Sequence, residues 1–182
     1  MLFRSDNLNA CQSAVQTAAL SGVITTESRI SVANVVVMSS NGTQQVGHMS
    51  TDDAGSFSFN NLAIGQKTSL SAAKDDDYGN GVTTYDIALL SRHILDIKPL
   101  NTPYKIIAAD VNHDGDVSAV DMLLMRRLVL KIITIFPNNT SWRFLDKKYI
   151  FSDPLNPLNE DFSEIINNTF NRAATTQLIL LP

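Results

Sequence analysis

The chain has 182 residues, 44% of them apolar and 18% charged, and its formal net charge is −4. This size accommodates one or two small globular domains with a real core. The acidic balance disfavours nucleic acid as a partner, and no stretch is apolar enough to span a membrane. Cys11 is the only cysteine, which excludes a disulfide within the chain.

Short apolar–polar alternations recur through residues 18–74. Turn residues separate them, among them Asn41-Gly42, the segment 52–55 and Gly65. Period-two runs divided in this way predict short strands that pack as an antiparallel β-sandwich. We expect the strands at 22–26, 30–38, 44–48, 56–59 and 68–72.

The spacing of apolar residues changes after residue 75. It becomes helical at Ile87, Leu90, Ile94 and Ile97, which predicts an amphipathic helix over 84–96. Residues 119–131 predict a second helix, with Pro99 and Pro103 in the connector. The Asn- and Pro-rich residues 137–182 predict the start of a further β region that the chain leaves incomplete.

The two helical segments belong to an internal repeat. A shift of 35 residues aligns Val82–Ile97 with Val117–Ile132, with identical Val, Asp, Leu, Arg and Ile residues in register. A loop–helix unit of this length cannot bury its own apolar face, so two copies are expected to pack against each other.

The loop before the second helix, Asp110–Asp121, has the pattern of a calcium-binding loop. Calcium prefers six to eight oxygen ligands, and oxygen-bearing side chains recur here at alternate positions with Gly115 at the sixth. Side-chain ligands are expected from positions 1, 3, 5 and 12, a backbone carbonyl from position 7 and a water-mediated contact from position 9. In order, these residues are Asp110, Asn112, Asp114, Asp121, Asp116 and Ser118. Val117 is expected to point into the core.

The corresponding loop of the first copy, Asp75–Asp86, is a weaker match. Its candidate ligands are Asp75, Asp77, Gly81, Thr83 and Asp86. Position 5 is Gly79, which has no side-chain oxygen, and position 6 is Asn80 in place of glycine. Two interpretations stay open: a calcium site of lower affinity, or a degenerate loop with a structural role.

A duplicated calcium loop, each copy followed by one helix and preceded by none, resembles the dockerin type I family over about residues 75–132. The resemblance implies an F-hand, all-α unit over 75–136 that binds Ca²⁺ and docks a cohesin-like domain. Carried over by register, the implied contact residues are Thr84, Tyr85, Ser91 and Arg92 in the first copy and Ala119, Val120, Arg126 and Arg127 in the second. A solvated helix face is the alternative for the Arg126–Arg127 pair.

The preceding residues 18–74 resemble a carboxypeptidase regulatory-like or Cna-B-like domain, through the stretch from Thr51 to Gly65. This resemblance implies a prealbumin- or immunoglobulin-like sandwich that acts as a spacer in secreted proteins. The combination gives a modular α+β chain with units at 18–74, 75–136 and 137–182.

No catalytic motif accompanies these features. His48, His93 and His113 lack zinc-site spacing, and neither a nucleophile elbow nor a phosphate loop occurs. The clustered carboxylates suggest a glycosidase in principle, but one bound ion explains their spacing better. We therefore expect no enzyme activity in this chain.

We expect a calcium-stabilised interaction or scaffold segment of a larger secreted or cell-surface bacterial protein, although no signal peptide is visible. Its partner is either a cohesin-like domain or the adjacent sandwich of the same chain. The alternative is an accessory region of a polysaccharide-degrading extracellular enzyme.

Overall fold

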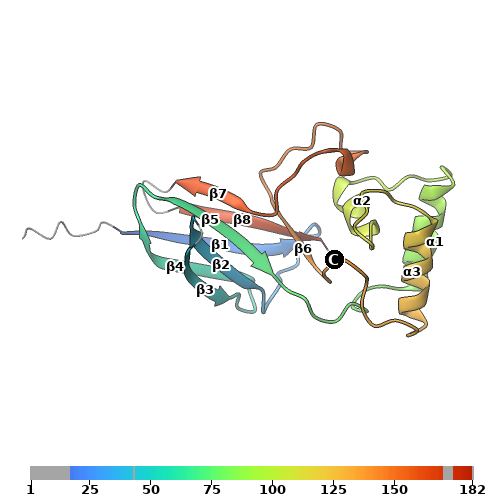
Figure 1. Cartoon of the computed structure of the whole chain (residues 1–182), viewed down its shortest axis with the longest axis horizontal. Helices are drawn as coiled ribbons and strands as arrows, with labels where there is room; N and C mark the ends of the chain where they lie inside the picture. Colours follow the sequence, from blue (N-terminus) through green and yellow to red (C-terminus); the bar gives the residue numbers. More distant parts are fainter. Residues whose placement is uncertain (1–16, 43, 170–173, 182) are drawn as a thin grey trace, which may run out of the picture.

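The computed structural model describes residues 17–42, 44–169 and 174–181 (Figure 1). Cys11 lies outside these residues. A β-sandwich forms one end of the molecule and a helical unit the other. The protein is therefore a mixed α+β chain, as the sequence predicts. Within the described residues, no helix has the length and apolarity needed to cross a membrane.

The N-terminal half of the sandwich follows the predicted alternation. Its strands are β1 (Thr17–Thr26), β2 (Val36–Asn41), β3 (Gln44–Ser50), β4 (Ser56–Ala63) and β5 (Lys67–Ala73). Buried and exposed residues alternate along β1 and β5, as expected for strands with one face against a core. The predicted strand at 30–38 is wrong in its first half, because regular pairing begins only at residue 36.

The turn at Gly55 shows why glycine is needed between β3 and β4. Its φ is +71°, and a Cβ atom there would lie 2.3 Å from the backbone oxygen of Ile24. Gly55 also accepts a hydrogen bond from the Ile24 amide through its own carbonyl. The turn therefore packs directly on β1, which leaves no room for a side chain.

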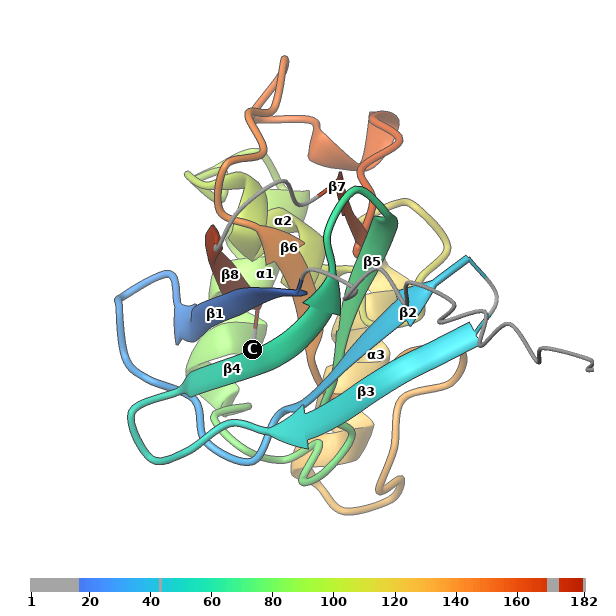
Figure 2. The ribbon, with the colours of Figure 1, turned by 90° about the vertical axis from the view of Figure 1, so that its left-hand side faces the viewer.

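Residues 137–182 do not open a separate β domain, and this expectation was wrong. Their strands β6 (Arg143–Asp146), β7 (Ile166–Thr169) and β8 (Ala174–Leu181) complete the same sandwich. The strand orders are β4-β1-β8-β6 and β3-β2-β5-β7. In Figure 2 the first sheet, with β1 and β4, lies to the left of the second, with β5, β2 and β3. The sandwich is also not wholly antiparallel, because β8 runs parallel to β1.

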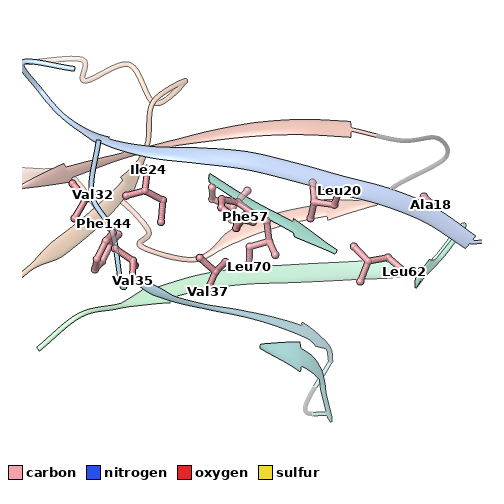
Figure 3. Packing of buried hydrophobic residues seen from close by; sticks show 11 residues of the cluster. Ala18, Leu20, Ile24, Val32, Val35, Val37, Phe57, Leu62, Leu70 and Phe144 are labelled. Atoms are coloured by element: carbon pink, nitrogen blue, oxygen red, sulfur yellow. The ribbon is translucent and has the colours of Figure 1, made fainter. Parts of the chain in front are cut away.

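The core of the sandwich lies between the two sheets (Figure 3). Both halves of the chain contribute to it, with Leu20 and Phe57 from one sheet, Val37 and Leu70 from the other, and Phe144 from β6. Burial of these apolar side chains stabilises the sandwich, and Phe144 and Ile166 of the C-terminal strands contribute to it. The helical unit is thus an insertion between β5 and β6.

The helical unit contains α1 (Thr84–Ile94), α2 (Pro103–Ala109) and α3 (Ala119–Val129). The equivalent helices α1 and α3 begin with capping boxes, at Thr83 and Ser118, and end two residues before their predicted limits. They enclose a core of buried apolar side chains: Leu90, Ala109, Val111, Leu124, Met125, Leu128 and Phe136. The two copies of the repeat therefore pack on each other as predicted.

Helix α2 was not predicted, and it corrects the expectation that no helix precedes the second loop. Thr102 caps it by accepting a hydrogen bond from the Lys105 amide, and Pro103 occupies its first turn. One face of α2 packs through Ile107 against Leu145 of β6 and against Phe151. This third apolar cluster joins the helical unit to the sandwich.

Candidate metal centre

The second loop connects α2 to α3, and its two ends are fixed by helix termini. Asp110 is the C-terminal cap of α2, and Asp121 occupies the third position of α3. Both side chains are fully buried, with an exposed fraction of 0%. The structure therefore buries the first and last predicted ligands, Asp110 and Asp121, close to each other. Asp114 and Asp116 lie at the surface.

Backbone amides of the loop turn inward onto Asp110. Its Oδ1 accepts a hydrogen bond from the Asp114 amide at 3.1 Å, and its Oδ2 accepts one from the Gly115 amide at 3.0 Å. The chain can curl this tightly because Gly115 has a φ of +86°, in the left-handed region that glycine tolerates. The glycine at position 6 thus allows the sharp turn of the loop around Asp110.

Asp121 closes the loop from the other end. Its Oδ1 accepts hydrogen bonds from the amides of Val111 at 3.0 Å and Asn112 at 3.4 Å. Its Oδ2 accepts one from the Ser118 amide at 2.8 Å, which completes the cap of α3. One carboxylate therefore ties residues from both ends of the loop to the start of the helix.

No basic side chain of the described residues forms an ion pair with either buried carboxylate. Among the residues that the structure describes, the ion pairs are Lys74–Asp76 and Arg143–Glu164, and neither involves the loop. Burial raises the pKa of Asp121 above its usual value, and the nearby Asp110 charge raises it further against the lowering effect of its hydrogen bonds. Two buried negative charges at one place are costly unless a cation neutralises them.

The chemistry of the donor set fits a hard cation such as Ca²⁺. The available donors are oxygens of Asp110, Asn112, Asp114 and Asp121, with no thiolate or imidazole in the inward positions. In the described part of the chain, no three His, Cys, Asp or Glu side chains gather around one point. Asp110 and Asp121 are thus the two predicted carboxylate ligands that the structure brings together. The remaining oxygens would have to come from Asn112, Asp114 and the Asp116 carbonyl when an ion binds. A bound calcium ion would supply the missing positive charge.

The first loop is organised differently. Its backbone forms two turns, with hydrogen bonds from the Asn80 amide to the Asp77 carbonyl and from the Val82 amide to the Gly79 carbonyl. Neither turn includes the carboxylate of Asp75, which is exposed. Asp86 caps α1 through Thr83, as Asp121 caps α3. In the second loop, backbone amides bond the carboxylate at position 1, Asp110. The first loop does not form the equivalent bonds to Asp75.

The residues implied as partner contacts lie on the surface of α1 and α3. Thr84, Arg92, Ala119, Arg126 and Arg127 are exposed, and Ser91 is half-buried. Tyr85 is 69% exposed and Val120 is 52% exposed. Leu123, which the sequence pattern did not single out, is also 52% exposed and follows Val120 by one helical turn. Spacing along α3 could have identified it.

A second missed residue, Asn139, lies on the return linker to the sandwich. Its side-chain amide donates a hydrogen bond to the backbone carbonyl of Asp110 at 3.1 Å. The start of the metal loop is thereby connected to the segment that leads into β6. No signal in the sequence identifies this contact, because the two residues are far apart in the chain.

A comparison with known protein families matches the region that contains both loops. The family model for the dockerin type I domain matches residues 75–130. Dockerin domains are non-catalytic, bind calcium and generally bind cohesin domains, so the match supports a calcium-binding, protein-docking module in this part of the chain. No curated protein matches the chain.

Several solved structures resemble parts of the chain. The TIE protein of Bacillus anthracis matches 32% of this chain and 11% of its own, with 22% identity and a TM-score of 0.29. A C-terminal fragment of the pilus adhesin SpaC from Lactobacillus rhamnosus GG matches 35% and 26%, with 12% identity and a TM-score of 0.30. The dioxygenase domain of a dioxygenase carbohydrate-binding protein fusion from Streptomyces sp. SirexAA-E matches 33% and 51%, with 18% identity and a TM-score of 0.24.

Proposed function

We propose that residues 75–136 form a docking module that binds one calcium ion in the second loop and, in that state, a cohesin-like domain. The observation that carries the proposal is the pair of fully buried carboxylates, Asp110 and Asp121, with no cationic side chain bonded to either in the described residues. A calcium ion would neutralise them and hold the two ends of the loop together. The dockerin type I match over residues 75–130 supports the assignment.

Calcium in this loop would order the surface that docks. Ser118 and Asp121 cap α3, and Val120 and Leu123 are exposed on the first turns of that helix. Fixing the loop therefore fixes the start of α3 and the position of these side chains. Exposed apolar residues flanked by Arg126 and Arg127 are a suitable contact surface for a protein partner.

Calorimetric titration of the full chain with calcium tests the metal step. We expect saturable binding that is lost in Asp110→Ala. Asp116→Ala is the matched control, because position 7 would contribute its backbone carbonyl and the side chain is exposed. Absence of binding by the unmodified chain, or equal loss in both variants, would contradict the assignment.

The docking step is tested by binding to an immobilised cohesin-like domain, with calcium and with chelator. The proposal requires binding that chelator abolishes and that Leu123→Glu weakens. A panel of cohesin-like domains that all fail to bind in calcium would remove the docking role and leave calcium binding as a purely structural property.

A second role, bracing between the two lobes, is favoured by a separate observation. The Asn139 side chain bonds the Asp110 carbonyl, and α2 packs on β6 through Ile107 and Leu145. Calcium in the loop would then stabilise the attachment of the helical unit to the sandwich. Thermal unfolding of the full chain would show one calcium-dependent transition, whereas independent lobes would show a calcium-independent sandwich transition.

We further propose that the chain belongs to a larger extracellular or surface bacterial protein, with the sandwich as a spacer of the carboxypeptidase regulatory-like kind. Dockerin domains occur in extracellular proteins, which supports this setting. An accessory region of a polysaccharide-degrading enzyme is the alternative. The flanking reading frame distinguishes them, because the alternative requires a catalytic domain there.

A further inference from the structure

Two linkers connect the lobes: the first contains most of the first loop, and the second passes beside it. Residues 74–83 lead from β5 to α1, and residues 130–142 lead from α3 back to β6. Figure 1 shows them as the two irregular segments that run between the sandwich and the helices. Since the helical unit is an insertion, any contact between the linkers restricts how that unit can turn on the sandwich.

The acidic residues at the start of the first loop make such contacts. The Asp75 Oδ1 accepts a hydrogen bond from the Ser141 amide at 2.9 Å. The Asp76 Oδ1 accepts one from the indole nitrogen of Trp142 at 3.1 Å, while its Oδ2 pairs with Lys74 at 2.6 Å. The hydrogen bond from Ser141 is the main cause of the lowered pKa of Asp75.

Aromatic and backbone contacts continue the same junction. The Tyr78 hydroxyl donates to the Asn139 carbonyl at 2.9 Å, and its ring lies edge-on to Phe136 with centroids 6.0 Å apart. The Ser141 hydroxyl donates to the Lys74 carbonyl at 3.4 Å. Residues 74–78 of one linker are thus bonded to residues 136–142 of the other by four hydrogen bonds in all.

These contacts conflict with a cation in the first loop. A calcium loop needs the position-1 carboxylate to face the ion, whereas Asp75 faces the opposite linker. Position 5 is Gly79, which offers no side-chain oxygen, and the loop amides bond backbone carbonyls in place of Asp75. The residues present therefore do not fit the ion that the repeat pattern implies.

We infer that the first loop is a latch between the linkers, formed by Asp75, Asp76 and Tyr78 on one side and Asn139, Ser141 and Trp142 on the other, and that it holds no calcium ion in the folded chain. The two copies of the repeat thus have different roles. The second loop keeps the calcium-ligand pattern, and the first loop fixes the helical unit to the sandwich. The latch does not depend on calcium binding by the second loop.

Asp75→Ala and Asp77→Ala, each in the full chain, distinguish a latch from a calcium site. Both residues are candidate ligands of the first loop, but Asp77 makes no side-chain hydrogen bond to the return linker in the described residues. We expect amide hydrogen exchange at Ser141 to accelerate about tenfold in Asp75→Ala, the effect of losing one charge-assisted hydrogen bond. Asp77→Ala should leave that exchange rate unchanged.

Calcium stoichiometry by calorimetry provides the second readout. We expect one ion per chain, with both variants unchanged in stoichiometry. Two ions per chain, one of them lost in Asp77→Ala, would overturn the latch, as would unaltered Ser141 exchange in Asp75→Ala. A stoichiometry of zero would instead overturn the calcium function proposed for the second loop, and the Ser141 measurement would still decide the latch.

Discussion

Replacing Asp110 by asparagine should change stability in a way that depends on calcium. Without calcium, the substitution removes one of two neighbouring buried negative charges, which favours the fold. It also replaces one carboxylate oxygen by an NH₂ group, so the Asp114 or Gly115 amide loses its acceptor at a cost of about 1 kcal/mol. These effects oppose each other, and we expect the free energy of unfolding to stay within about 1 kcal/mol of the unmodified chain.

With calcium present, the same substitution should be clearly destabilising. An ion that binds only the folded state adds about 2.7 kcal/mol to the free energy of unfolding at 100 times its Kd. Asp110→Asn would lose most of this calcium-dependent increase in the free energy of unfolding, because the loop loses a charged ligand at position 1. For a chain of this size, the difference corresponds to about 5–10 °C in Tm.

Thermal unfolding of both proteins, followed by circular dichroism in excess calcium and in excess chelator, measures the effect. Asp116→Asn is the control, because it makes the same change of charge in the same loop at an exposed side chain that is not expected to ligate. The reasoning is refuted if the unmodified chain has the same Tm in both conditions. It is also refuted if Asp110→Asn lowers Tm equally in both.

Three further predictions concern packing, docking and pH. Leu90→Ala should lower the free energy of unfolding by about 2–5 kcal/mol in urea titrations, because Leu90 is buried between α1 and α3; a loss below about 1 kcal/mol would contradict that packing. Leu123→Glu should weaken cohesin-like binding at least about tenfold in surface plasmon resonance while changing stability by less than about 0.5 kcal/mol, since the side chain is exposed. Asp75 should titrate below 3.8 by NMR, because its folded pKa is lowered; its contribution to stability is then present above pH 3.8 and is lost as pH falls through the folded pKa. A titration midpoint at or above 3.8 would contradict this expected lowering of the Asp75 pKa.

Local patterns in the sequence predicted the elements whose cause is local. Gly42 and Gly55 have positive φ at the predicted turns, and the helices α1 and α3 begin at Thr and Ser caps three residues before an aspartate. The half-buried Val117 packs on the helical core as predicted. Helix α2 could have been predicted in the same way, because Thr102-Pro103 is a typical start signal.

Long-range pairing could not be predicted in this way. The apolar run Leu178–Leu181 in β8 is consistent with a strand but does not say that its neighbour is β1, about 150 residues earlier. The ligand pattern of the second loop was visible in the sequence, and the structure buries both Asp110 and Asp121. By contrast, the bond from Asn139 to Asp110 and the bonds from Ser141 to Asp75 depend on how the return linker passes the loops, which single-sequence patterns do not encode.

The parallel pairing of β1 with β8 has a mechanical consequence. Hydrogen bonds in register from Leu20 with Ala174 to Thr26 with Leu180 connect the two strands side by side. Tension applied at the start of β1 and the end of β8 would load these bonds simultaneously in shear, which resists rupture better than opening them one by one. The helical insertion between β5 and β6 lies outside that line of force.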